Sequence, residues 1–313
     1  MPETVSLDDV RAARETIGSD LHRTPVFSSA TLGPRVFLKA ELFQRTGSFK
    51  PRGVLNKLRS LGEEERARGV IGVSAGNHAQ ALAYCARLEG LDALLVMWKT
   101  ASPAKIEATR GYGAEVDLEA AGPETVFARL EELREQTGRT FVHPFDDPFV
   151  IAGQGTVGLE IGESVPDVDV VVVPVGGGGL IAGIATALPD ARIVGVEPQG
   201  SNALSSALEA GHSVPVEPRS IADGLNAPFA GELPLQIAAA RGIDIALVEE
   251  DEIEAGMRFV YERAKLACEP AGAAGVAALL AGKVSQREGE TVVAVVSGGN
   301  VSGETAAAIL AQL

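Results

Sequence analysis

One lysine lies in a stretch suited to covalent chemistry. Lys50 occupies "TGSFKPRG" (46–53), between an aromatic residue and a proline and flanked by glycines and small polar residues. The chain holds seven lysines against twenty arginines, so lysine is not its general surface residue. A lysine amine can form a Schiff base with a carbonyl compound, and it can also act as a general base. Lys50 is therefore the candidate reactive residue.

A run of four glycines is the candidate anion site. The stretch "VVVVPVGGGGLIAGIATAL" joins a strand pattern, the glycines and a helix pattern. Glycines allow backbone N–H groups to wrap an anion at the start of a helix, where the helix dipole favours negative charge. A tight turn explains one glycine, whereas four in a row favour a phosphate site. The run consists of Gly176, Gly177, Gly178 and Gly179.

The same loop also fits a dinucleotide. Gly177, Gly179 and Ala182 match the pattern G-x-G-x-x-A. Glu197 closes the next predicted strand twenty residues after the first of these glycines, where a dinucleotide site places its acidic residue. A Walker phosphate loop is excluded because no Lys-Ser/Thr pair follows the glycines. The segment alone leaves a small phosphate cofactor and a dinucleotide both open.

Two further polar groups follow predicted strands. Ser74, Asn77 and His78 stand where "GVSAGNHAQALAY" changes from a strand pattern to a helix pattern. A helix start suits a carboxylate, although an Asn/His cap without a ligand would have the same sequence. Ser297 follows the apolar run in "TVVAVVSGGN" and can make one neutral hydrogen bond, or simply form a strand-end turn. The four histidines form no metal-ligand pattern.

The elements that position these residues alternate along the chain. β-branched runs at 167–175, 192–198 and 291–299 are typical of parallel strands buried on both faces. Strands alternating with helices predict an open α/β sheet, in which ligands bind beyond the carboxyl ends of the strands. Further strands are predicted at 35–42, 69–74, 92–98, 114–119 and 140–145, and helices at 51–62 and 77–90.

The composition excludes several partners. The net charge of −15 repels nucleic acid and anionic membranes. The N-terminus lacks the apolar segment of a signal peptide, and no apolar run reaches the about 20 residues of a membrane span. Two cysteines, Cys85 and Cys268, form no disulfide framework and fit a reducing compartment. We therefore expect a cytoplasmic protein that binds neither nucleic acid nor membrane.

One small cofactor uses nearly all of these features together. Pyridoxal phosphate requires an amine for a Schiff base, a phosphate site, a partner for its pyridine nitrogen and room for the carboxylate of an amino-acid substrate. A dinucleotide would use only the glycine loop and Glu197, and it would leave Lys50 unexplained. The residues therefore favour pyridoxal 5'-phosphate and an amino-acid substrate.

The sequence resembles the fold-type II pyridoxal-phosphate enzymes, specifically the threonine/serine dehydratase and serine racemase group. "GSFK", "SAGNHAQ" and "GGGGLIAG" carry the resemblance most specifically. The matching stretches, which also include "EPAGA" and "VSGGNV", run in the family's order from residue 22 to 301. The resemblance implies a tryptophan synthase β-like α/β fold of two open twisted subdomains with the cofactor between them. It divides the chain into a large cofactor domain (1–64 and 147–313) and a small, mobile substrate domain (65–146).

The resemblance also implies roles for individual residues. Lys50 would carry the cofactor and act as the catalytic residue, Asn77 would bond the ring hydroxyl, and Ser297 would meet the pyridine nitrogen. The implied cofactor-binding residues are Phe49, Lys50, Asn77, Gly176, Gly177, Gly178, Gly179, Leu180 and Ser297. The implied substrate-binding residues are Ser74, Ala75, Asn77 and His78.

Three differences from the family's pattern distinguish between its branches. In the racemase branch a serine occupies the position of Ala75 and works as an acid/base opposite the lysine, so alanine here disfavours racemisation. That branch also binds a divalent cation through a glutamate and an aspartate six residues later. Here Glu197 is followed at that distance by Ala203, and we expect no metal. The chain ends at residue 313, where the biosynthetic threonine dehydratases continue into a regulatory domain, so a catabolic-type enzyme is expected.

These observations together predict a lyase. It would dehydrate and deaminate L-threonine, L-serine or both to a 2-oxo acid plus ammonia, and it would act as a homo-oligomer, a dimer or a tetramer. The alternatives within the family are a serine racemase and a dehydratase of a bulkier β-hydroxy amino acid such as phenylserine or hydroxyaspartate. The alternatives outside it are an NAD-type oxidoreductase and a non-catalytic protein that binds the cofactor or an amino acid.

Overall fold

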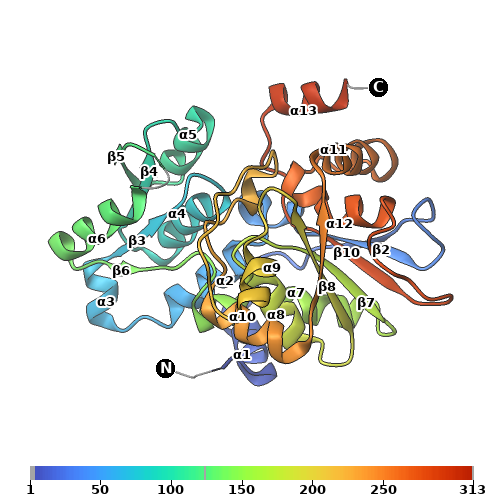
Figure 1. Ribbon diagram of the computed structural model, residues 1–313. Helices are drawn as coiled ribbons and strands as arrows, with labels where there is room; N and C mark the ends of the chain where they lie inside the picture. The colour runs from blue at the N-terminus through green and yellow to red at the C-terminus, as the bar shows by residue number, and fades with distance from the viewer. Residues whose placement is uncertain (1–3, 123–124, 312–313) are drawn as a thin grey trace.

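Two sheets, one mostly parallel and one fully parallel, organise the part of the chain that the computed structural model describes, residues 4–122 and 125–311 (Figure 1). The larger sheet has the order β1-β2-β10-β7-β8-β9, and only its β1–β2 pair is antiparallel. Its strands are β1 (Val26–Ser28), β2 (Val36–Ala40), β7 (Val170–Pro174), β8 (Arg192–Pro198), β9 (Asp244–Val248) and β10 (Val292–Val296). The mixed α/β class predicted from the sequence is confirmed.

The smaller sheet has the order β5-β4-β3-β6, with every pair parallel. Its strands are β3 (Val70–Val73), β4 (Ala93–Trp98), β5 (Glu115–Ala120) and β6 (Thr140–Phe141). In Figure 1 this sheet lies beside the larger one, with cyan and green strands. All four strands fall within 65–146, the range expected for the small domain.

Helices cover both faces of the larger sheet because its central strands are apolar on both sides. Val171 and Val173 of β7 pack with the cluster under α7 (Pro148–Ser164) and α8 (Gly179–Ala187). Val170 and Val172 pack on the opposite face with α11 (Glu250–Phe259) and α12 (Pro270–Leu280). The other helices of this part are α1 (Leu7–Ile17), α9 (Ala203–Ala210), α10 (Glu232–Arg241) and α13 (Gly303–Leu310).

The smaller sheet is covered in the same way. Its apolar face toward the larger sheet packs on α2 (Pro51–Arg59), α4 (Asn77–Glu89) and α5 (Pro103–Gly111), and its other face packs on α6 (Val126–Thr137). The short α3 (Glu63–Arg68) leads into β3. Because α2 contacts both α4 and α7, it joins the two sheets. Among the described residues, no helix combines the length and the apolar character that crossing a bilayer requires.

Most predicted strands are present, with three differences. The strand predicted at 140–145 ends at Phe141, because the chain then turns so that His143 Nδ1 accepts the N–H groups of Phe145 and Asp146. The strands β1 and β9 were not predicted. Both are edge strands that are only partly buried, so neither has a continuous apolar run.

Candidate functional site

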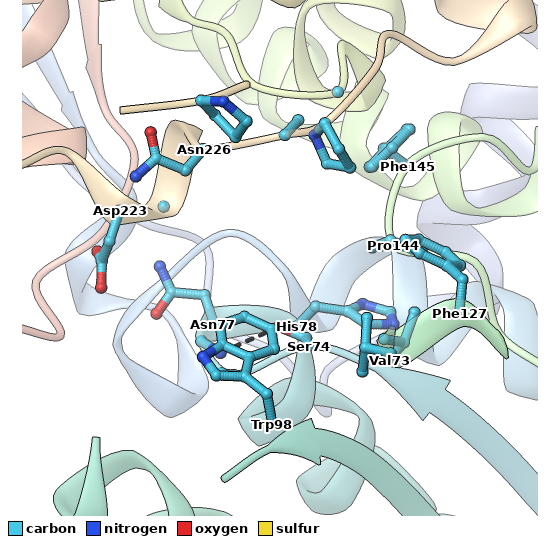
Figure 2. Close-up of a pocket in the computed structure, with 18 of the residues that line it drawn as sticks. Val73, Ser74, Asn77, His78, Trp98, Phe127, Pro144, Phe145, Asp223 and Asn226 are labelled. Atoms are coloured by element: carbon cyan, nitrogen blue, oxygen red, sulfur yellow. Dashed lines mark hydrogen bonds between the residues drawn. The ribbon is translucent and has the colours of Figure 1, made fainter. Parts of the chain in front are cut away.

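The residues singled out from the sequence meet between the two sheets. A cavity of about 620 Å³ is lined by Lys50 and by the α4 start, with Asp223 and Asn226 opposite (Figure 2). An adjoining narrow cavity of about 40 Å³ shares Lys50 and Asn77 with it. The narrow cavity is also lined by Phe49, Gly176, Gly177, Gly178, Gly179, Leu180, Glu269 and Ser297. The structure therefore places every predicted site residue along one or both cavities.

Lys50 lies where the loop after β2 becomes α2, with Pro51 as the first helical residue. The loop is fixed to the end of β10, since the Phe49 N–H donates to the Ser297 carbonyl over 3.2 Å. Burial lowers the pKa of Lys50 to about 8, although the nearby Glu269 acts to raise it. The Lys50 amine is thus neutral, and nucleophilic, in a larger fraction of molecules near neutral pH than an ordinary lysine.

The glycine loop has no room for side chains. Gly178 has a φ of 92°, in the left-handed region that glycine tolerates best. A Cβ on Gly177 would lie 2.3 Å from the Phe145 ring, and one on Gly179 would lie 2.9 Å from the Phe145 carbonyl oxygen. Close packing therefore explains the glycines by itself, and they are not sufficient evidence of a phosphate site.

The backbone amides of the same loop give independent support for an anion site. Within the described residues, no acceptor is bonded to the N–H groups of residues 176–180, which lead into α8. These groups lie at the positive end of the helix dipole and line the narrow cavity. Amide groups in this arrangement can bind an anion such as a phosphate.

The start of α4 offers a second set of amides. Ser74 Oγ accepts the Gly76 N–H over 3.0 Å, and the N–H groups of Ala75, Asn77 and His78 have no acceptor in the described part of the chain. The His78 ring is turned away from this edge, with Nε2 at 3.0 Å from the Val142 carbonyl oxygen. Burial, aided by Lys50, lowers the pKa of His78 to about 3, so the ring is neutral. The main-chain N–H of His78, and not its imidazole, is therefore the group that is free to bind a ligand here.

Ser297 follows β10 and is 4% exposed. Its hydroxyl has no hydrogen bond to any described residue, and it lines the narrow cavity. A buried hydroxyl without a protein partner is available to a ligand.

Two residues that bind the Asn77 side chain, Glu269 and Asn300, were not predicted from the sequence. Glu269 is 2% exposed and accepts a hydrogen bond from Asn77 over 2.7 Å. Burial first, and then the nearby Asp223, raise the pKa of Glu269 to about 7. Asn300 donates to Asn77 over 2.8 Å. Both lie in stretches that matched the family, "EPAGA" and "VSGGNV", and a glutamate among apolar residues was the available sequence signal.

A buried cluster of charges was missed as well. Arg52 binds the carboxylates of both Glu41 and Glu160 at distances of 2.7–2.9 Å, and Lys39 also donates to Glu160. All four side chains are nearly or fully buried. Lys39, like Lys50, is therefore removed from the surface. Unlike Lys50, it is paired with two carboxylates, those of Glu41 and Glu160. Because Arg52 follows Lys50 by two residues, the cluster anchors the start of α2.

Glu197 has an internal role. Its carboxylate accepts the N–H groups of Leu204 over 2.7 Å and Ser205 over 2.9 Å, at the start of α9. Glu197 lines neither cavity. It is therefore not placed to bind the ribose of a dinucleotide, as an NAD-type oxidoreductase would require. In the ranges 4–122 and 125–311, no group of three or more His, Cys, Asp or Glu could hold a metal ion.

The chain is similar to known proteins over most of its length. The family model described as "Pyridoxal-phosphate dependent enzyme" matches residues 17–298. The L-threonine dehydratase catabolic TdcB of Staphylococcus aureus is 45% identical over 95% of this chain and 89% of that protein. The L-threonine ammonia-lyase of Thermotoga maritima is 42% identical over 95% of this chain and 76% of that protein. The structure of maize serine racemase superposes with a TM-score of 0.92 at 36% identity, covering 96% of this chain and 95% of that one.

Proposed function

The chain belongs to the family of pyridoxal-phosphate-dependent enzymes, and on this premise we propose that it dehydrates and deaminates L-threonine, L-serine or both to a 2-oxo acid and ammonia. The observation that carries the proposal is the position of Lys50. Its amine, with a pKa lowered to about 8, lies between the amides of the glycine loop and those of the α4 start. One set of amides suits a phosphate and the other suits the carboxylate of an amino acid.

The residues present fit the cofactor. The narrow cavity brings together a nucleophilic amine at Lys50, unbonded amides at residues 176–180 and an unbonded hydroxyl at Ser297. When bound, pyridoxal phosphate supplies an electron sink that weakens the bond from the substrate α-carbon to its proton. We propose that the glycine-loop amides with Leu180 hold the phosphate, that Phe49 packs beside the ring and that Ser297 meets the pyridine nitrogen.

The remaining residues act on the substrate. We propose that the amides of Ala75, Asn77 and His78, with Ser74, bind its carboxylate and so orient the α-carbon toward Lys50. The Lys50 amine then takes the α-proton as the general base. Ala75 has no proton to exchange, so only one face of the α-carbon has an acid/base group. This supports elimination over the racemisation that the similarity to serine racemase also suggests.

The size of the larger cavity favours a second candidate within the same reaction class. Trp98 at the end of β4 and Phe127 of α6 line it (Figure 2). Val216 and Pro228 line it as well. Its volume of about 620 Å³, which the cofactor and the substrate would share, lies within the range of sites for drug-sized ligands. A dehydratase of a bulkier β-hydroxy amino acid such as phenylserine is therefore the alternative to test.

We also propose that residues 65–146 form a domain that moves over the site. An ion pair supports this, because Lys105 of α5 reaches Asp223 in η3 (Asp223–Leu225), on the far side of the larger cavity.

A cytoplasmic homodimer is a further proposal. Two observations favour it: both cysteines are free, and Phe27 and Phe43 form an exposed aromatic pair at a sheet edge.

The decisive experiment compares Lys50→Ala with Lys99→Ala, which removes an exposed lysine. The parent and Lys99→Ala should release 2-oxo acid from L-threonine and show visible absorbance from the lysine-bound cofactor. Lys50→Ala should show neither, and turnover by this variant would overturn the proposal. A substrate panel of L-threonine, L-serine and phenylserine, with chiral analysis of the residual serine, separates the alternatives.

A further inference from the structure

Four groups that are far apart in the sequence form one line of hydrogen bonds. The Asn300 side-chain NH₂ donates to the Thr46 carbonyl over 2.7 Å and to the Asn77 carbonyl oxygen Oδ1 over 2.8 Å. The Asn77 side-chain NH₂ in turn donates to Glu269 Oε1 over 2.7 Å. The line connects the loop before Lys50, the end of β10, the start of α4 and the start of α12.

The line has only one consistent direction. The shape of an asparagine does not distinguish its amide oxygen from its nitrogen, so the partners must decide the orientation. The Thr46 carbonyl can only accept, and it therefore requires the NH₂ of Asn300. That NH₂ also faces Asn77, so Asn77 must present its oxygen there and its own NH₂ to Glu269. An acceptor at each end, a main-chain carbonyl and a carboxylate, fixes both amides.

The orientation leaves one donor unused. The Asn77 NH₂ has two N–H bonds, and only the one to Glu269 has an acceptor among the described residues. Asn77 lines both cavities, and Figure 2 shows its amide at the cavity edge on the side of Asp223. A free N–H at this edge suits a ligand oxygen that carries negative charge. The opposite orientation would aim the amide oxygen at the Glu269 carboxylate and would repel such a ligand.

Asn300 also holds the backbone that leads to Lys50. Thr46 has a φ of 60°, which is rare for a β-branched residue, and its carbonyl is the one that Asn300 binds. Gly47 is confined by the same amide, since a Cβ there would lie 2.6 Å from Asn300 Oδ1. Asn300 therefore couples the loop that presents Lys50 to the side chain of Asn77.

We propose that Asn300 and Glu269 are positioning residues that orient the Asn77 amide so that its free N–H meets the ring oxygen of the cofactor. The inference rests on the proposed function, because it concerns how this chain receives pyridoxal phosphate. Neither residue need touch the reacting atoms. Asn300 sets the direction of the line from one end, and Glu269 holds it from the other.

The experiment measures cofactor binding without substrate. Asn300→Asp keeps the size of the side chain but replaces the shared NH₂ by an oxygen that faces two acceptors. Asn56→Asp is the matched control, because the Asn56 NH₂ also donates to a main-chain carbonyl, that of Phe149 over 2.8 Å, and it lines neither site cavity. The readouts are the dissociation constant for pyridoxal 5'-phosphate and the pH midpoint of the visible band of the bound cofactor.

Asn300→Asp should weaken binding of pyridoxal 5'-phosphate by about tenfold or more and displace the pH midpoint, since a hydrogen bond to a charged group is lost. Glu269→Gln keeps size and an acceptor but loses the charge, so a smaller change in the same direction is expected. Asn56→Asp should leave both readouts at the parent values. If Asn300→Asp is insoluble, Glu269→Gln supplies the comparison by the same two readouts.

The outcomes separate this inference from the proposed function. A parent protein that binds no pyridoxal 5'-phosphate overturns the proposed function and this inference with it. A parent that binds the cofactor and releases 2-oxo acid, while Asn300→Asp and Glu269→Gln match Asn56→Asp in both readouts, overturns the inference alone.

Discussion

The amine of Lys50 donates a hydrogen bond to the main-chain carbonyl of Pro144 over 3.0 Å. Lys50 immediately precedes α2, whereas Pro144 lies in the segment that leaves the smaller sheet after β6. The contact holds the amine at the boundary of the two sheets, where Lys50 is partly buried. The titration of this amine is therefore a direct report on the geometry of the site.

Cofactor attachment should follow the titration of Lys50. Because burial lowers the pKa of Lys50 to about 8, the neutral amine forms as the pH rises through that value. The rate at which visible absorbance appears on mixing apoprotein with pyridoxal 5'-phosphate should rise with a midpoint near 8 and then level off. Stopped-flow mixing across this range measures it. A midpoint near the ordinary lysine value of about 10.4 would show that the amine is not buried as described.

Ala75→Ser should introduce racemisation. Ala75 lines the larger cavity, so a hydroxyl there supplies the acid/base group that alanine lacks on the face opposite Lys50. Incubation with L-serine should yield measurable D-serine at some cost in 2-oxo acid release. Ala75→Gly alters the same position without a hydroxyl and should give no D-serine. Equal racemisation by both variants would refute the role given to this position.

Arg52→Leu should destabilise the protein strongly. It leaves Glu41 and Glu160 buried with only Lys39 as a positive partner. Breaking a buried charge cluster in this way lowers the free energy of unfolding by about 3–5 kcal/mol. Guanidinium unfolding measures the change.

The control is Arg11→Leu, whose pair with Asp8 is exposed on both sides. This change should lower the free energy of unfolding by about 1 kcal/mol or less. Similar losses for the two arginines would mean that burial does not strengthen the Arg52 pairs.

The ion pair between Lys105 and Asp223 should affect substrate binding. If it helps to hold the smaller sheet over the site, Lys105→Ala and Asp223→Ala each raise KM for L-threonine, by about fivefold or less because Asp223 is solvent-exposed. The double variant should then resemble the single variants, since both remove one interaction. Steady-state kinetics of the three variants test this, and fully additive effects on KM would exclude the coupling.

The sequence predicted the strands that are buried on both faces and the loops that follow them. The β-branched runs of β7, β8 and β10 are unambiguous, and parallel topology brings their carboxyl ends to one edge. The edge strands β1 and β9 were missed because half-buried strands lack such runs. Side-chain contacts between residues that are distant in the sequence could not be predicted either. Nothing in the local sequence indicates that Glu160 lies beside Arg52, or that Glu269 lies beside Asn77, 192 residues away.

One buried ion pair could have been predicted from the sequence but was not. Lys39 and Glu41 are two residues apart at the end of a predicted strand, so they share a face of an otherwise apolar element. Charges in that position require partners. The glycines of the loop at 176–179 were attributed to phosphate binding. The structure shows that close packing requires them as well.

The packing around the glycine loop also limits how this enzyme can evolve. Each glycine is opposed by a neighbour from elsewhere in the chain: Gly176 by Leu225, Gly177 and Gly179 by Phe145, and Gly178 by Pro234. A Cβ at Gly177, Gly178 or Gly179 would lie within 3.0 Å of such a neighbour, and one at Gly176 would lie 3.2 Å from the Leu225 backbone. A larger residue at these positions therefore requires a compensating change or shift in the neighbour that it meets.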